Sequence, residues 1–133
     1  KLLIHRRAFG KYHSEGLWTN ACCSHPLPGE SIVEAANRRL VEEMGMNTSL
    51  APLFSFIYRA ELDNNLVEHE LDHVLIGFTD DEPLVNMEEV CDYKWVSIHE
   101  LEDHIAAEPQ AYTEWFKKII LEYRSAFDDI LKS

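Results

Sequence analysis

The chain has 133 residues, of which 24 are acidic and 12 basic, so its formal net charge at pH 7 is −12. This length fits one domain, and 46% hydrophobic with 27% charged residues is typical of a globular protein rather than a disordered one. The negative balance argues against non-specific binding to nucleic acid and against docking on anionic membranes. No apolar run approaches the roughly 18 residues that span a bilayer.

The first part of the chain predicts strands separated by a loop. Residues 1–6 are typical of a strand, and residues 7–18 of a loop, because glycines and polar groups interrupt the apolar pattern. Residues 19–23 form a short strand candidate that ends at a proline-rich turn. Because Lys1 lies within a strand-like run, we expect further residues upstream of it.

A helix is predicted over residues 31–44. Ser31 and Glu34 form a capping-box pattern, and Gly45 suits the C-terminal cap. The helix has one apolar face, an opposite charged face and a shoulder between them. The apolar face consists of Val33, Ala36, Leu40 and Met44, and the charged face of Glu34, Arg38 and Glu42. The positions between the two faces are Arg39 and Glu43.

The second half predicts a hairpin, a strand and two helices. Residues 53–58 and 66–78 are strand-like and flank a turn at 63–65. A strand at 91–96 precedes a helix that begins with the capping pattern of Ser97 and Glu100 and ends near residue 106. After Pro109, one long amphipathic helix is predicted from apolar positions 112, 116, 119, 123, 127 and 130. This order indicates an α+β fold with helices packed on a sheet.

Two clusters carry side chains suited to catalysis or metal binding. In an extended segment Cys23 and His25 share a face and form a nucleophile–base pair or part of a metal site, although a buried structural cysteine is the commoner case. Glu68, Glu70 and Asp72 share one face of their strand, with His69 and His73 on the other. A solvated face would tolerate these carboxylates, but the strand continues into residues 74–78, which we expect to be central and buried. Burial favours a hard divalent cation there.

Two further charge clusters suggest a phosphate ligand. Glu42 and Glu43 could hold Mg²⁺ against a diphosphate, although ordinary solvated charge is the favoured explanation of this cluster in isolation. Arg6, Arg7 and Lys11 form a basic cluster in an acidic protein, which suggests an anionic ligand unless the clustering is chance.

Together these motifs resemble the type 1 isopentenyl-diphosphate isomerase family, a branch of the Nudix fold. The stretches that carry the resemblance are Arg6-Arg7-Ala8-x-x-Lys11, Trp18-Thr19-Asn20-x-x-Cys23-x-His25-Pro26, Gly29-Glu30-Ser31, Tyr58-Arg59-Ala60 and Val67-Glu68-x-Glu70. The resemblance covers nearly all of the chain. It implies a mixed β-sheet sandwiched by helices, in a single domain over residues 1–133 that lacks its N-terminal segment.

The Nudix box also matches, with two departures. Counting back from Gly45 aligns the conserved pattern of that motif with Glu30, Arg38, Leu40, Glu42 and Glu43. Ser24 stands where the motif has its first glycine, and Arg39 stands where it has a glutamate. A reversed charge at a metal-ligand position weakens the case for a Nudix hydrolase and suits the isomerase branch, in which this arginine resembles a diphosphate ligand.

The resemblance implies an isomerase that moves a double bond between isopentenyl and dimethylallyl diphosphate. This reaction needs an acid and a base on opposite faces of a dry pocket. Cys23 and Glu70 match these two groups, with Tyr58 assisting Glu70. Trp115 matches an aromatic that covers the pocket and whose π-face stabilises a cation, although a tryptophan at such a position is more often simply core.

The resemblance also implies ligands for metal and for diphosphate. His25, Glu68 and Glu70 match a site for Mn²⁺, Mg²⁺ or Zn²⁺, and Glu43 matches a ligand of Mg²⁺ on the diphosphate. The family brings two further histidines from upstream of the segment that matches here. The residues that match diphosphate contacts are Arg7, Lys11 and Arg39.

We therefore expect a small-molecule diphosphate as the substrate, no nucleic-acid or membrane partner, and a monomer. Three cysteines, two of them adjacent, do not make a disulfide scaffold, so we expect a reducing compartment, the cytoplasm. The alternatives are a Nudix-type hydrolase of a nucleoside diphosphate, and a non-enzymatic module on a Nudix scaffold.

Overall fold

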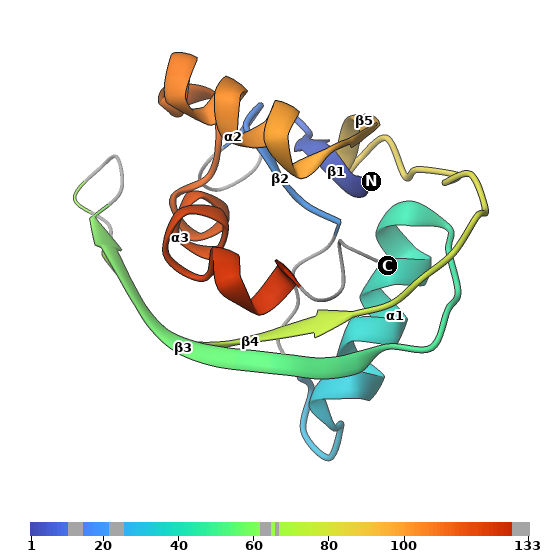
Figure 1. Cartoon of the computed structure of the whole chain (residues 1–133). Coiled ribbons are helices and arrows are strands. Elements are labelled where there is room, and N and C mark those ends of the chain that lie inside the picture. Colours follow the sequence, from blue (N-terminus) through green and yellow to red (C-terminus); the bar gives the residue numbers. More distant parts are fainter. Residues whose placement is uncertain (11–14, 22–25, 62–64, 66, 129–133) are drawn as a thin grey trace.

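The structure is an α+β fold in which helices cover strands (Figure 1). The computed structural model describes residues 1–10, 15–21, 26–61, 65 and 67–128, the side chains of residues 60 and 68–70 excepted. Its elements in chain order are β1 (Leu2–Arg7), β2 (Trp18–Asn20), α1 (Ile32–Met44), β3 (Ala51–Glu61), β4 (Val67–Ile76), β5 (Val90–Val96), α2 (Ile98–Ala107), η2 (Pro109–Ala111), α3 (Glu114–Glu122) and η3 (Arg124–Phe127). The α+β prediction is confirmed.

The described strands form two antiparallel units. One is a three-stranded sheet in the order β2-β1-β5, and the other is the β3–β4 ribbon. The ribbon confirms the predicted hairpin. Parallel pairing, which a mixed sheet requires, occurs in the described part at one isolated bridge, between Trp18 and Tyr112. This bridge joins β2 to the segment that precedes α3.

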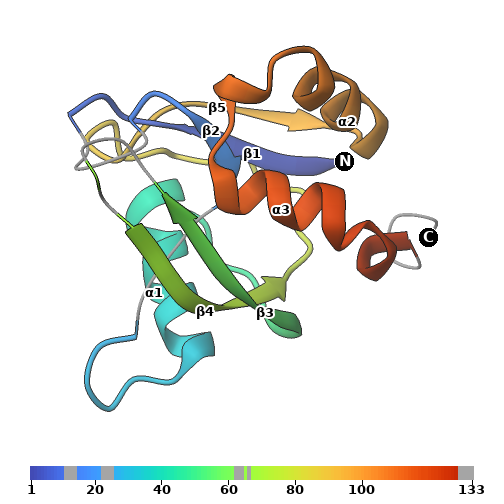
Figure 2. The same cartoon turned by 90° about the vertical axis from the view of Figure 1, so that its left-hand side faces the viewer.

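Two apolar clusters cover opposite faces of the three-stranded sheet. Ile4 of β1 belongs to the larger cluster, which also contains residues of β3, α2 and α3. Its neighbour Leu3 packs against the smaller cluster, which contains Leu40 and Met44 of α1. Because successive side chains of a strand point to opposite faces, α1 lies on one side of the sheet and α2 with α3 on the other. Figure 2, turned by 90°, shows β1, β2 and β5 in the upper part of the molecule and the β3–β4 ribbon in the lower part.

Helix α1 begins and ends where the sequence predicts. The Ser31 hydroxyl accepts a hydrogen bond from the backbone N–H of Glu34 at 3.1 Å, and the Glu34 carboxylate accepts one from the N–H of Ser31 at 3.2 Å. Gly45 ends the helix at a φ of 62°. The buried face is Ala35, Ala36, Leu40, Glu43 and Met44. Compared with the predicted apolar face, the buried face of α1 is therefore rotated toward Glu43, and Val33 is only half-buried.

The prediction of one long C-terminal helix is wrong. The helix α3 spans Glu114–Glu122, with a 3₁₀ turn on each side of it. Tyr112 is extended and pairs with Trp18, so the helix begins only after Thr113. It ends at Tyr123, whose ring stacks on Phe54 at 5.0 Å. The apolar face was identified correctly, since Tyr112, Phe116, Ile119 and Phe127 are buried.

The expectation that residues 74–78 are central and buried is also wrong. Residues 74–77 are half-buried and Phe78 is 70% exposed. In the described part of the chain, β4 pairs with β3 alone, so no strand covers its other edge. No helix among the described residues is long and apolar enough to cross a membrane.

Candidate active site

Three of the predicted site residues meet at the indole of Trp115. This ring comes from α3 and is almost fully buried. The ring of buried Tyr58, on β3, meets it edge-on with centroids 6.4 Å apart. The guanidinium of Arg7, at the end of β1, lies 5.5 Å from the centre of the indole. A tyrosine, a cation and an indole are thus brought together from three elements that are distant in sequence.

The indole N–H also has a partner. It donates a hydrogen bond to Oδ1 of Asn20, on β2, at 3.2 Å. Asn20 appears in the motif of the resemblance, but the sequence assigned it no role. The sequence alone could not indicate this contact, because Asn20 and Trp115 are 95 positions apart in the chain. The one sequence signal that could have indicated Asn20 is its position three residues before Cys23, a predicted site residue.

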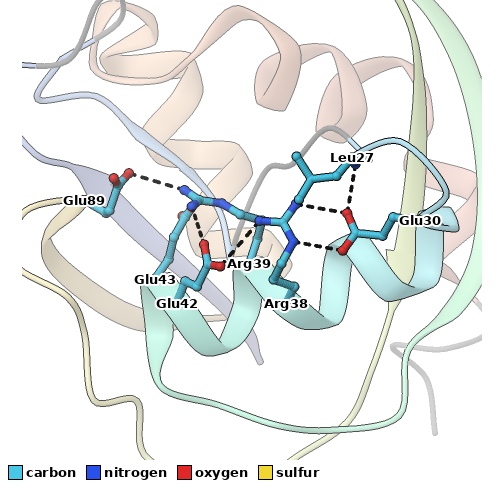
Figure 3. A network of polar contacts seen from close by, with 7 residues as sticks. All are labelled: Leu27, Glu30, Arg38, Arg39, Glu42, Glu43 and Glu89. Carbon is cyan, nitrogen blue, oxygen red and sulfur yellow. Dashed lines mark hydrogen bonds and ion pairs between the residues drawn. The ribbon is translucent and has the colours of Figure 1, made fainter.

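A second cluster gathers around Arg39 on α1 (Figure 3). Its guanidinium contacts Glu42 and Glu43, each at 2.6 Å, and Glu89 at 3.4 Å. Glu43 is buried, whereas Glu42 and Glu89 are more accessible. Glu89 lies 50 positions from Arg39 and carries no local signal, so sequence reasoning missed it.

The Glu30–Arg38 pair fixes the segment before α1. The two N–H groups of Arg38 reach the two carboxylate oxygens of Glu30 at 2.9 and 3.1 Å. Glu30 also accepts a hydrogen bond from the backbone N–H of Leu27 at 2.9 Å. Two parallel bonds fix orientation as well as distance. Glu30 and Arg38 of the Nudix pattern therefore hold the turn at residues 27–30 against α1.

These pairings shift the titration of the charged groups. Hydrogen bonds from Arg38 and from Leu27 lower the pKa of Glu30, and the hydrogen bond from Arg39 lowers the pKa of Glu42. Burial opposes the charge of Arg39, but Glu43 and Glu42 outweigh it and raise the pKa of Arg39 above its ordinary value. The carboxylates of Glu30 and Glu42 are therefore ionised at neutral pH.

The remaining predicted site residues are described in part or not at all. Lys11, Cys23 and His25 lie outside the described residues, and so does Ser24 of the Nudix pattern. For Glu68 and Glu70 the backbone alone is described. It places Glu70 opposite Tyr58 in the register of the β3–β4 ribbon.

The acidic cluster on α1 is the described region best suited to a cation. Here the carboxylates of Glu30, Glu42, Glu43 and Glu89 lie beside the guanidiniums of Arg38 and Arg39. Oxygen donors of this kind suit Mg²⁺. Within the described ranges, however, no three histidine, cysteine or acidic side chains are gathered as a metal site. Of the predicted ligands, only the Glu43 side chain belongs to those ranges.

A family model of the NUDIX domain matches residues 1–118. The chain belongs to the Nudix family. Its relatives include proteins named isopentenyl-diphosphate Delta-isomerase. The chain is 56% identical to "Isopentenyl-diphosphate Delta-isomerase 2" of Photorhabdus laumondii over 119 residues, covering 90% of this chain and 67% of the relative. It is 51% identical to the isomerase of Pectobacterium atrosepticum over 117 residues, covering 88% of this chain and 65% of the relative.

A third relative, "Isopentenyl-diphosphate Delta-isomerase 2" of Aromatoleum aromaticum, is 49% identical to this Nudix chain over 115 residues, covering 86% of this chain and 61% of the relative. The chain thus spans about two thirds of the length of these relatives. Solved structures agree on the fold. A MutT protein from Methanosarcina mazei superposes with a TM-score of 0.74 at 19% identity, covering 98% of this chain and 85% of that one. DR0079 from Deinococcus radiodurans gives 0.73 at 22%, covering 90% and 72%.

Proposed function

We propose that this Nudix chain interconverts isopentenyl and dimethylallyl diphosphate. The names of its relatives support this activity. The observation that carries it is the buried indole of Trp115, with Tyr58 and Arg7 around it. An aromatic face stabilises a cation without offering a lone pair that could trap it. This environment suits a reaction that passes through a tertiary carbocation.

The chemistry is a pair of proton transfers. A proton adds to the terminal carbon of the double bond, and the resulting tertiary cation loses a proton from the carbon on its other side. In our proposal Cys23 and Glu70 supply these two groups from opposite faces, exchanging roles with the direction of the reaction. Glu70 is the register partner of Tyr58, which supports the assignment of Tyr58 as its assistant.

The diphosphate and the metals are assigned to charged residues around this pocket. Arg7, Lys11 and Arg39 bind the diphosphate. Glu43, a buried carboxylate beside Arg39, holds Mg²⁺ there. His25, Glu68 and Glu70 hold a second divalent metal, Mn²⁺, Mg²⁺ or Zn²⁺. The metals supply positive charge that neutralises the diphosphate and orders the carboxylates.

A single-domain monomer in the cytoplasm completes the proposal, because a reactive thiol at Cys23 needs a reducing compartment. The runner-up, hydrolysis of a nucleoside diphosphate, is disfavoured by Arg39. This cation stands at a position where the hydrolase motif has an acidic metal ligand, and it is bound to the neighbouring carboxylates.

The test is incubation of the full-length protein with isopentenyl diphosphate and Mg²⁺ in D₂O, followed by NMR. We expect the dimethylallyl isomer, uptake of deuterium and no release of phosphate. Cys23→Ala should abolish turnover with little change in the unfolding midpoint, whereas the adjacent Cys22→Ala should remain active. Release of phosphate or of a nucleoside monophosphate from a nucleotide substrate would favour the hydrolase, and full activity of Cys23→Ala would refute the assignment of the thiol.

A further inference from the structure

The strand that leads to Cys23 is fastened at three consecutive residues. Thr19 is fully buried, and its hydroxyl lies 2.9 Å from the hydroxyl of Thr113. Asn20 accepts the indole N–H of Trp115, and the carbonyl of Ala21 is 2.8 Å from Nδ1 of His5. The three hydrogen-bond partners, Thr113, Trp115 and His5, lie at different places around this segment, so together they fix both its location and its rotation.

The hydroxyl pair has a defined direction. Thr19 donates its hydroxyl proton to Oδ1 of Asn20 at 2.8 Å. A threonine hydroxyl has one proton, so Thr113 must be the donor toward Thr19. Oδ1 of Asn20 therefore receives two hydrogen bonds, one from Thr19 and one from Trp115. This double acceptance fixes the amide so that its oxygen faces the indole.

The hydrogen bond from the Thr113 hydroxyl to the Thr19 hydroxyl, the Thr113–Thr19 relay, leaves α3 without a side-chain cap at its N-terminus. Thr113 is the N-cap residue of α3, a position where a threonine hydroxyl usually accepts from the helix backbone. Here it makes no such bond and is fully buried against Thr19 instead. The backbone N–H of Thr113 also donates to the carbonyl of Trp18 at 3.0 Å. The start of α3 is thus fastened to β2 at the expense of its own cap.

We propose that Asn20 is a positioning residue. It holds the Trp115 indole in the orientation in which its face covers the pocket beside Arg7 and Tyr58, and the Thr113–Thr19 relay fixes its amide. An indole has a single N–H donor, and Asn20 accepts its proton. The contacts of this ring with Tyr58 and Arg7 are ring contacts, which constrain its tilt less than a hydrogen bond does. This role rests on the proposed isomerase function, because it acts through the ring that stabilises the cation.

The test combines kinetics with NMR of the indole groups in the full-length protein. Asn20→Leu removes the acceptor at similar volume. We expect its kcat to fall about tenfold, because an indole that is free to tilt stabilises the cation less well, while KM changes less than twofold. Asn20→Asp keeps an oxygen acceptor and should recover most of kcat. In ¹⁵N spectra, Asn20→Leu should shift the indole N–H signal of Trp115 and speed its exchange, leaving Trp18 and Trp95 unchanged.

A double-mutant cycle separates positioning from general damage. In a Trp115→Phe background the indole N–H is gone, so Asn20→Leu should lower kcat less than twofold further. Multiplied losses in the double variant, or an unshifted Trp115 signal in Asn20→Leu, would overturn the positioning role. A wild-type protein that converts no isopentenyl diphosphate refutes the proposed function and, with it, the catalytic purpose of the network, whereas the NMR result still decides whether the network holds the indole.

Discussion

Single residues in this protein serve several partners at once. Arg39 balances Glu42, Glu43 and Glu89, and Oδ1 of Asn20 accepts from both Thr19 and Trp115. The sequence could predict the partners of Arg39 one turn away on the helix, because three- and four-residue spacings place side chains together. It could not predict Glu89 or Trp115 as partners, because those contacts exist only once distant segments have folded together.

The Glu30–Arg38 pair predicts a pH dependence of stability. The pKa of Glu30 lies below its ordinary 4.5, so the pair stabilises the fold above that pH and loses its effect as the pH falls through the lowered value. We expect Glu30→Gln to unfold at lower urea concentration than the wild type at pH 7, with the difference shrinking as the pH falls below 4.5. Urea unfolding between pH 7 and pH 3 measures it. Glu61→Gln, at the exposed end of β3, is the matched control, and a constant difference across pH would contradict the assignment.

Whole elements were predictable where their ends carry local signals. The capping box and Gly45 delimit α1 to the residue, because these signals are hydrogen bonds and backbone angles within one turn of the helix end. The C-terminal helix was predicted too long because apolar periodicity continues through Tyr112 and Tyr123, where tertiary contacts impose other backbone conformations. Residues 74–78 were predicted as central and buried because apolar composition does not reveal how many strands cover the edges of β4.

Gly45 predicts a stability difference that a matched glycine can measure. Both Gly45 and Gly29 have positive φ, at 62° and 82°. A Cβ at Gly45 would lie 2.5 Å from the carbonyl oxygen of Leu84, whereas one at Gly29 would meet no atom of the described residues within 4 Å. We expect Gly29→Ala to cost about 1 kcal/mol for the left-handed conformation alone. Gly45→Ala should cost roughly 1–3 kcal/mol more because of the overlap. Equal losses in urea unfolding would show that the segment around Leu84 yields.

At the scale of the molecule, charge opposes the compact state. A net charge of −12 on 133 residues creates repulsion that salt screens. We expect the melting temperature to rise by roughly 2–5 °C between 10 and 150 mM NaCl, although the surface ion pairs weaken over the same range. Differential scanning calorimetry measures the change, and choline chloride should give the same rise if screening alone is responsible. A falling melting temperature would mean that local ion pairs dominate.

The relay between β2 and α3 also bears on how the protein is made. Thr19 and Thr113 are separated by 94 positions. A ribosome therefore releases the strand that leads to Cys23 long before the helix that secures it. Until residues 113–122 clear the exit tunnel, the nascent chain has neither the Trp115 indole nor the Thr113 hydroxyl that contact β2. A copy truncated before α3 would lack the Trp115 indole on which the proposed reaction depends, so we expect it to show no isomerase turnover.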